Sequence, residues 1–141
     1  MAETRFNCGS VSEVGVYSLS EMGPGLRVSE HFTLEEFACS DGSDVVLIHP
    51  GLIQLLESIR LEIGGPLYIN SAYRSHHHNS IIGGAKTSKH LYGLAADVRS
   101  PGIHPNQIAI FAEQLNVGGI GHYENFTHLD VYGVNRRWRK D

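Results

Sequence analysis

Hydrophobic residues recur at helical spacing in two stretches of the chain. Over residues 49–65, apolar positions follow one another at intervals of three and four, which places them on one face of a helix. Pro50 suits the first turn of this helix, and Gly64 and Gly65 suit its end. The same spacing predicts a second helix over residues 104–116. The inward-facing positions are Leu52, Leu55, Leu56, Ile59 and Ile63 in the first helix, and Ile108, Phe111, Ala112 and Leu115 in the second.

Shorter patterns predict a further helix start and several strands. Thr33 suits a helix N-cap, with Glu36 three residues later to complete a capping box. Phe32, just before the cap, is placed to pack on Phe37. Strands are predicted over residues 66–74, 118–123 and 127–132, with a turn at 124–126 between the last two.

The remaining segments are predicted from their composition. Residues 75–88 are rich in glycine and polar residues and favour a long loop of the kind that carries a site. Residues 1–28 favour an arm or edge hairpin, and the basic residues 134–141 favour an exposed tail. The whole chain, residues 1–141, is therefore expected to form one α+β domain, with a small antiparallel sheet flanked by helices.

Composition narrows the function classes. A net charge of −4 gives no sign of a nucleic-acid-binding surface, and no apolar run approaches the roughly 20 residues of a membrane span. The N-terminus lacks the pattern of a signal peptide, and Cys8 and Cys39 favour free thiols over a disulfide. The unusual feature is the count of nine histidines, which invites a search for a metal site.

His90 and Asp97 form the first candidate pair of metal ligands. In a continuous helix they would lie roughly 10 Å apart along the axis, and in a continuous strand they would lie further apart on opposite faces. They can share an ion only if the chain turns between them. Gly93 can supply that turn, and Ala95 and Ala96 allow the backbone to pack closely before a strand that fixes Asp97.

His128 and Asp130 form the second pair. Residues two apart on a strand point to the same face, whereas Leu129 and Val131 would face the core. One member of the pair could bind a metal while its neighbour acts beside it. Two nitrogen or oxygen ligands from the first pair, one from the second and an open water position together describe a catalytic zinc site.

Three ordered motifs resemble the M15 peptidases, which are zinc D-Ala-D-Ala carboxypeptidases and peptidoglycan endopeptidases. These motifs are INSAYRS with the following HN, then GGAKTSKHLYGLAADV, then GIGHYENFTHLDV. The resemblance covers roughly residues 30–133 and is strongest to the small phage- and prophage-encoded branch, which also carries a segment like HFTLEEFAC. It implies the fold shared with the Hedgehog signalling domain.

The resemblance also implies roles for individual residues. His90, Asp97 and His128 are the implied zinc ligands. Arg74 resembles the arginine near the metal, where a guanidinium can stabilise an oxyanion. Ser88 resembles a residue that binds a substrate carboxylate or backbone. The remaining pair, expected to orient Arg74 or to line the rim, is His78 and Asn79.

The proton-transfer group departs from the pattern of the relatives. Many carry a carboxylate three residues before the third ligand, but Asn125 stands there and cannot serve as a base. We expect Asp130 to act as the base or to orient the water, with Glu124 as the alternative if the turn brings it in. A swap, in which Asp130 is the ligand and His128 the acid or base, stays open.

We therefore expect a monomeric zinc peptidase that hydrolyses the peptide stems or cross-links of peptidoglycan, without nucleic acid or membrane insertion. Its expected setting is a phage or prophage lysis or wall-penetrating enzyme, made in the cytoplasm and acting on the wall after release or as part of a virion. The alternative is a zinc-stabilised module that binds the cell wall without cutting it.

Overall fold

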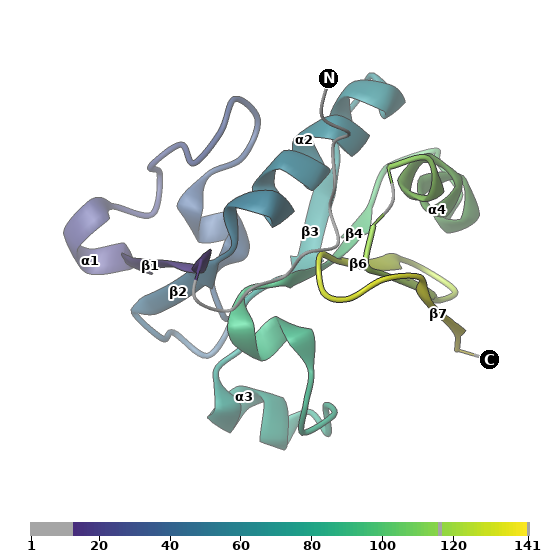
Figure 1. The fold of residues 1–141 in the computed structure, drawn as a ribbon. Helices are drawn as coiled ribbons and strands as arrows, with labels where there is room; N and C mark the ends of the chain where they lie inside the picture. Colours follow the sequence, from purple (N-terminus) through teal and green to yellow (C-terminus); the bar gives the residue numbers. More distant parts are fainter. Residues whose placement is uncertain (1–12, 116, 141) are drawn as a thin grey trace.

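The computed structural model describes residues 13–115 and 117–140, which form two β-sheets with helices around them (Figure 1). The smaller sheet pairs β1 with β2, and the larger has the strand order β3-β4-β6-β5-β7. The strands are β1 (Gly15–Ser18), β2 (Val45–Ile48), β3 (Tyr68–Ser71), β4 (Ala95–Arg99), β5 (Gly119–His122), β6 (Thr127–Asp130) and β7 (Arg136–Arg139). The helices are α1 (Leu19–Met22), η2 (Leu34–Phe37), α2 (Pro50–Ile63), α3 (His76–Ile81), η3 (Lys89–Tyr92) and α4 (Pro105–Glu113).

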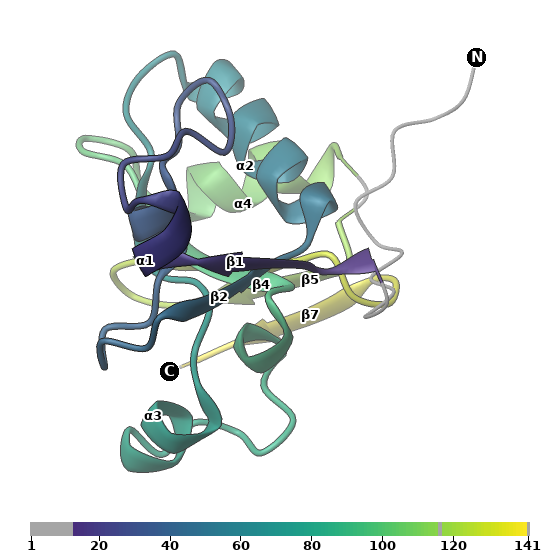
Figure 2. The same cartoon turned by 90° about the vertical axis from the view of Figure 1, so that its left-hand side faces the viewer.

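The larger sheet separates an apolar side from a polar side. Figure 2 shows α2 and α4 on one side of the strands and α3 on the other. Alternate side chains of β4 and β6, including Val98 and Leu129, join the apolar faces of α2 and α4 in the core. Because side chains alternate along a strand, Asp97 and His128 point to the opposite face. The α+β class and the small antiparallel sheet flanked by helices are therefore confirmed, apart from one parallel pair.

The two long helices begin in the same way, with a histidine followed by proline. The Nδ1 atom of His49 accepts a hydrogen bond from the Gly51 amide at 2.9 Å, and that of His104 accepts one from the Asn106 amide at 3.0 Å. Each histidine is thus the N-cap of its helix and satisfies an amide that would otherwise lack a partner. Part of the surplus of histidine therefore has a structural use.

Several predicted elements are confirmed by the structure. The two amphipathic helices, the strand after residue 66 and the two strands joined by a turn at residues 124–126 are all present. The capping box also forms, since the Glu36 carboxylate accepts a hydrogen bond from the Thr33 amide at 2.7 Å. Phe32 and Phe37 pack edge to face, with ring centroids 6.1 Å apart.

One N-terminal segment and one central segment differ from the prediction. Residues 15–18 pair with β2 and do not form an arm or a hairpin of their own, and residues 1–12 lie outside the described residues. The segment 75–88 is not all loop, because it contains α3. Ser75 starts this helix by accepting a hydrogen bond from the His78 amide at 3.0 Å, a capping signal that the run of polar residues obscured.

The C-terminal segment is the largest correction. Residues 134–141 were expected to form an exposed tail, but Arg136–Arg139 form β7, which pairs in parallel with β5. Two contacts explain the difference. Arg137 forms an ion pair with Glu113 of α4 at 2.8 Å, and the Trp138 ring packs against the His128 ring with centroids 4.9 Å apart. The basic composition of this segment suggested an exposed tail, but two consecutive residues, Arg137 and Trp138, make specific contacts with the rest of the fold.

Two further expectations concern membranes and cysteines. Among the described residues, no helix has both the length and the apolar character that crossing a bilayer requires. Cys39 is buried, with its Sγ atom 3.9 Å from the Ser75 hydroxyl. Cys8 lies outside the described residues, so the expectation of free thiols stays a prediction.

Candidate metal centre and its cleft

Three side chains from three elements bring their ligand atoms together on the polar face of the larger sheet. They are His90 of η3, Asp97 of β4 and His128 of β6, all buried, and one ligand atom from each lies within 4.8 Å of the others. Asp97 Oδ1 lies 3.2 Å from His90 Nε2 and 3.0 Å from His128 Nδ1. The β4–β6 register places Asp97 directly opposite His128, so strand pairing itself builds two thirds of the group.

A turn at Gly93 brings His90 back to Asp97. Gly93 has a φ of 75°, and a Cβ at this position would lie 2.4 Å from the Leu47 carbonyl oxygen. A side chain there would be strained and would also collide with β2. At the other end of η3, the Ser88 hydroxyl accepts a hydrogen bond from the His90 amide at 3.3 Å. The short helix is therefore fixed at both ends, and it presents His90 to the strand that follows.

Each histidine has its second ring nitrogen held by a different partner. His90 Nδ1 lies 2.7 Å from the Ala72 carbonyl oxygen, which can only accept, so this nitrogen donates and Nε2 is left for a ligand bond. His128 Nε2 lies 2.8 Å from Asp130 Oδ2, which leaves Nδ1 facing Asp97. Histidines that bind zinc are held in this way by a carbonyl or a carboxylate. Two imidazole nitrogens and one carboxylate oxygen fit a zinc ion with an open fourth position.

Asp130 lies behind His128, away from the space in front of the three ligand atoms. Its side chain is fully buried, and Oδ1 accepts hydrogen bonds from the Tyr132 amide at 3.1 Å and from Arg136 Nη1 at 2.7 Å. The carboxylate fits there because Gly119 faces it, and a Cβ at Gly119 would lie 2.4 Å from Oδ2. With both oxygens occupied, Asp130 is placed to orient His128, and this geometry does not suit the expected role of a base.

The charges around His128 favour a positive charge at the centre. Burial alone would raise the pKa of Asp97, but hydrogen bonds from His128 and His90 hold that pKa well below its usual range. Burial alone would lower the pKa of His128, but its contacts with Asp130 and Asp97 raise it. Two ionised carboxylates therefore flank one imidazole. A bound cation would balance the negative charges of these two carboxylates, as a proton on His128 does.

Arg74 contacts the oxygen of Asp97 that the two histidines leave free. Its Nη2 atom is 3.4 Å from Asp97 Oδ2, and its other nitrogens donate to Ser71 Oγ at 3.1 Å and to Asn79 Oδ1 at 3.2 Å. Asn79 is itself buried and donates to the Ala85 carbonyl at 2.9 Å. The structure thus gives Asn79 the expected contact with Arg74. His78 lies elsewhere, with Nε2 3.2 Å from the Ser40 hydroxyl, outside the lining of the cleft.

A cleft of about 680 Å³ opens in front of the three ligand atoms, a size that suits a short peptide. Arg74 and Ser88 line it as expected. Glu124 does not line this cleft. It is exposed and lines another groove, of about 320 Å³. The remaining lining is Gly83, Gly84, Ala85, Thr87, Lys89, His90, Asp97, Tyr123, Phe126, His128, Tyr132, Arg136, Trp138 and Lys140.

The C-terminal strand supplies a wall of the cleft that was not expected from the sequence. Arg136, Trp138 and Lys140 stand two residues apart and all line the cleft. Trp138 fits because Gly121 lacks a side chain, and its Nε1 donates to the Tyr123 hydroxyl at 3.1 Å. The signal was present in the sequence. This alternation contains the only tryptophan of the chain, and period-two spacing is typical of a strand.

Comparison with known proteins agrees with this geometry. The model of the peptidase M15 family matches residues 30–130, a range that contains all three candidate metal ligands. A curated relative, the probable peptidoglycan L,D-endopeptidase MepK of Haemophilus influenzae, is 33% identical over 100 residues. That match covers 64% of this chain and 53% of the relative, so the chain spans about half of its length. The chain belongs to the M15 family of peptidases.

Proposed function

We propose that this chain is a zinc-dependent peptidase that hydrolyses the peptide stems or cross-links of bacterial peptidoglycan. The observation that carries the proposal is the convergence of His90, Asp97 and His128, buried, at a cleft large enough for a peptide. Membership of the M15 family supports a peptidase. The substrate class is supported by the relative, whose name describes an endopeptidase of peptidoglycan.

The donor set fits zinc, and such an ion, when bound, supplies a water of lowered pKa and polarises a carbonyl group. His90 and His128 would hold the ion through Nε2 and Nδ1, with Asp97 as the third ligand. The Ala72 carbonyl and Asp130 keep the two rings in orientation. A fixed ligand geometry lowers the cost of reorganisation during the reaction.

Two further side chains are proposed to act on the substrate. Arg74 is held by Ser71 and Asn79 beside Asp97, where its guanidinium can stabilise the negative charge that develops on a peptide oxygen. Ser88 lines the cleft next to His90 and can donate its hydroxyl proton to a substrate carbonyl or carboxylate. His78 lies outside the cleft, so we assign it no contact with the substrate.

One observation favours a second candidate function. Among the described residues, Asp97 is the only carboxylate in the cleft lining, so neither Asp130 nor Glu124 is placed to accept a proton from a water there. A module that holds zinc and binds the wall without cutting it would need no such group. The family favours the peptidase. The expectation of a phage or prophage enzyme, released to the wall or carried on a virion, comes from the sequence resemblance and stays a prediction.

Digestion of purified sacculi tests the proposal. We expect the zinc-loaded protein to release peptide fragments that mass spectrometry can assign to one bond of the stem or cross-link. Excess chelator should stop their release, because removal of zinc removes both the activated water and the ion that polarises the scissile carbonyl. Protein that sediments with sacculi, carries zinc and releases no fragment would contradict the peptidase and favour the binding module.

A further inference from the structure

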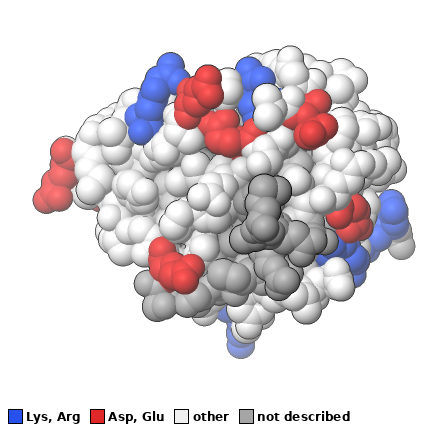
Figure 3. Space-filling view, turned by 45° about the horizontal axis from the view of Figure 1, so that its top comes forward, with Lys and Arg blue, Asp and Glu red and all other residues white. Residues whose placement is uncertain are grey.

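The cleft differs in charge from the chain as a whole. The chain has a net charge of −4, and acidic and basic side chains are interspersed on the face that Figure 3 shows. The cleft lining holds four cationic side chains and one carboxylate, Asp97, which is a candidate metal ligand. The four are Arg74, Lys89, Arg136 and Lys140. With an ion bound, this cleft would be strongly positive, and such a site attracts anionic ligands.

Two of the cations gather at one aromatic ring beside the metal centre. Lys89 Nζ lies 4.0 Å from the centroid of the Tyr132 ring, and Arg136 Cζ lies 5.4 Å from it. Lys89 immediately precedes His90, and Arg136 bonds to the carboxylate of Asp130, which in turn contacts His128. The two cations therefore lie near one ring but come from different elements, Lys89 from η3 and Arg136 from β7.

The charges of these two side chains are not balanced in the same way. Arg136 is paired with Asp130 at 2.7 Å and also donates to the Tyr132 carbonyl at 3.0 Å. Within residues 13–115 and 117–140, Lys89 has no carboxylate partner, and its ammonium group lies over the face of the Tyr132 ring. A cation–π contact holds an ammonium group on one side and leaves N–H donors on the other side free for a ligand. Lys89 is thus a positioned cation that has no counter-ion in the described part of the chain.

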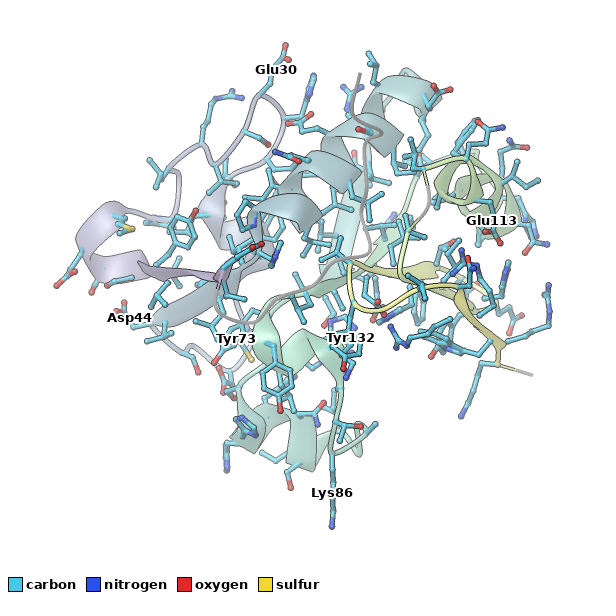
Figure 4. The ribbon with its side chains drawn as sticks, viewed as in Figure 1. Glu30, Asp44, Tyr73, Lys86, Glu113 and Tyr132 are labelled. Atoms are coloured by element: carbon cyan, nitrogen blue, oxygen red, sulfur yellow. The ribbon has the colours of Figure 1, made fainter. Side chains whose placement is uncertain are left out.

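The aromatic residues on the same wall of the cleft as Arg136 contact one another. Trp138 donates to the Tyr123 hydroxyl, and the Tyr123 ring stacks on Phe126 with centroids 4.5 Å apart. Figure 4 shows Tyr132, which is 39% exposed, near the middle of the view, whereas Lys86 extends away from the body of the molecule in the loop after α3. The two lysines of this segment therefore differ. Lys89 lines the cleft, and Lys86 is exposed outside it.

We propose that Lys89, with Tyr132 and Arg136 beside it, forms a subsite that binds a carboxylate of the substrate next to the metal centre. This inference rests on the proposed function. It adds a selectivity: the enzyme prefers stem peptides that carry a free carboxylate at one position over the same peptides with a carboxamide at that position. A peptide stem can carry carboxylates on D-Glu, on meso-diaminopimelate and on the terminal D-Ala. The subsite takes one of them, and the chemistry that it recognises is common to all three.

The test compares four synthetic stem peptides, one with all carboxylates free and three with a single carboxylate converted to a carboxamide. Binding is followed by the fluorescence of Trp138, the only tryptophan, which lies in the cleft. The binding titration is run with chelator present, which prevents hydrolysis. In a second experiment, kcat/KM for each peptide is measured with the zinc-loaded protein. For the wild-type protein, one of the three amidations should weaken both quantities about tenfold, the effect of a hydrogen bond to a charged group.

Variants assign this preference to Lys89. Lys89→Met keeps an unbranched side chain on Tyr132 but removes the charge and the N–H donors. The affinity for the free peptide should therefore fall about tenfold, to that for the amidated peptide. Lys89→Arg should retain the preference, and Lys86→Met should match the wild type. Equal weakening of all four peptides by Lys89→Met, or a wild type that does not discriminate, would overturn the subsite. A preference in binding that persists without any hydrolysis would instead refute the proposed function alone.

Discussion

The His90→Ala protein is expected to lose both its zinc and its hydrolytic activity. Removal of His90 leaves two ligands, Asp97 and His128, too few to hold an ion firmly in a catalytic site. Metal-ion catalysis contributes several kcal/mol of transition-state stabilisation, so the rate should fall about a thousandfold or more. Elemental analysis of the dialysed protein and the rate of stem-peptide cleavage measure the two effects.

A matched control separates this effect from a general loss of histidine. His77 is exposed on α3 and lies outside the cleft, so His77→Ala should keep the zinc content and activity of the wild type. Because His90 is buried and holds the Ala72 carbonyl, His90→Ala should also lose about 1–3 kcal/mol of stability, which a thermal melt detects. A folded His90→Ala protein that cleaves at the wild-type rate would refute the assignment of the ligands.

The Asp130→Asn protein is expected to bind zinc about 10- to 100-fold more weakly while keeping its fold. The carboxylate of Asp130 holds the far ring nitrogen of His128 at 2.8 Å and is itself held by Arg136. An amide of the same size removes this charge and weakens the orientation of the ligand. Activity should therefore be low at limiting zinc and should recover when zinc is in excess.

Recovery with zinc distinguishes the orienting role that the contact with His128 suggests for Asp130 from the role of base that was expected from the sequence. A residue that only orients His128 affects the occupancy of the site, and occupancy responds to zinc concentration. A general base affects the rate of the occupied site, so its loss would persist at saturating zinc. Glu124→Gln serves as the control, because Glu124 is exposed and outside the cleft, and it should behave as the wild type. A loss of kcat in Asp130→Asn that zinc does not restore would contradict the orienting role.

The parts of the site that the sequence could predict depend on local rules. The pair His90 and Asp97 is linked by a glycine turn within one short segment, and period-two alternation on β6 fixes which residues share a face with His128. The two amphipathic helices were predictable for the same reason, since their apolar spacing is visible within one window. Each of these inferences needs only residues that are near in sequence.

The parts that the sequence missed depend on pairing between distant segments. The period-two alternation of β7 is visible in the sequence, but its place in the sheet depends on parallel pairing with β5 and on the ion pair between Arg137 and Glu113. The position of Asp130 shows the same limit. Alternation places it on the same face as His128, but the room at Gly119 and the bond from Arg136 decide that its carboxylate points away from the cleft.

The most direct test of the zinc site and its activity is a titration of the zinc-free protein with zinc, in which stem-peptide cleavage is measured at each addition. We expect no cleavage without zinc, a linear rise, and a plateau at one zinc ion per chain, because one group of three ligands forms among the described residues. Cleavage at full rate in the zinc-free protein would contradict the account. So would an absence of cleavage once one zinc ion per chain is bound.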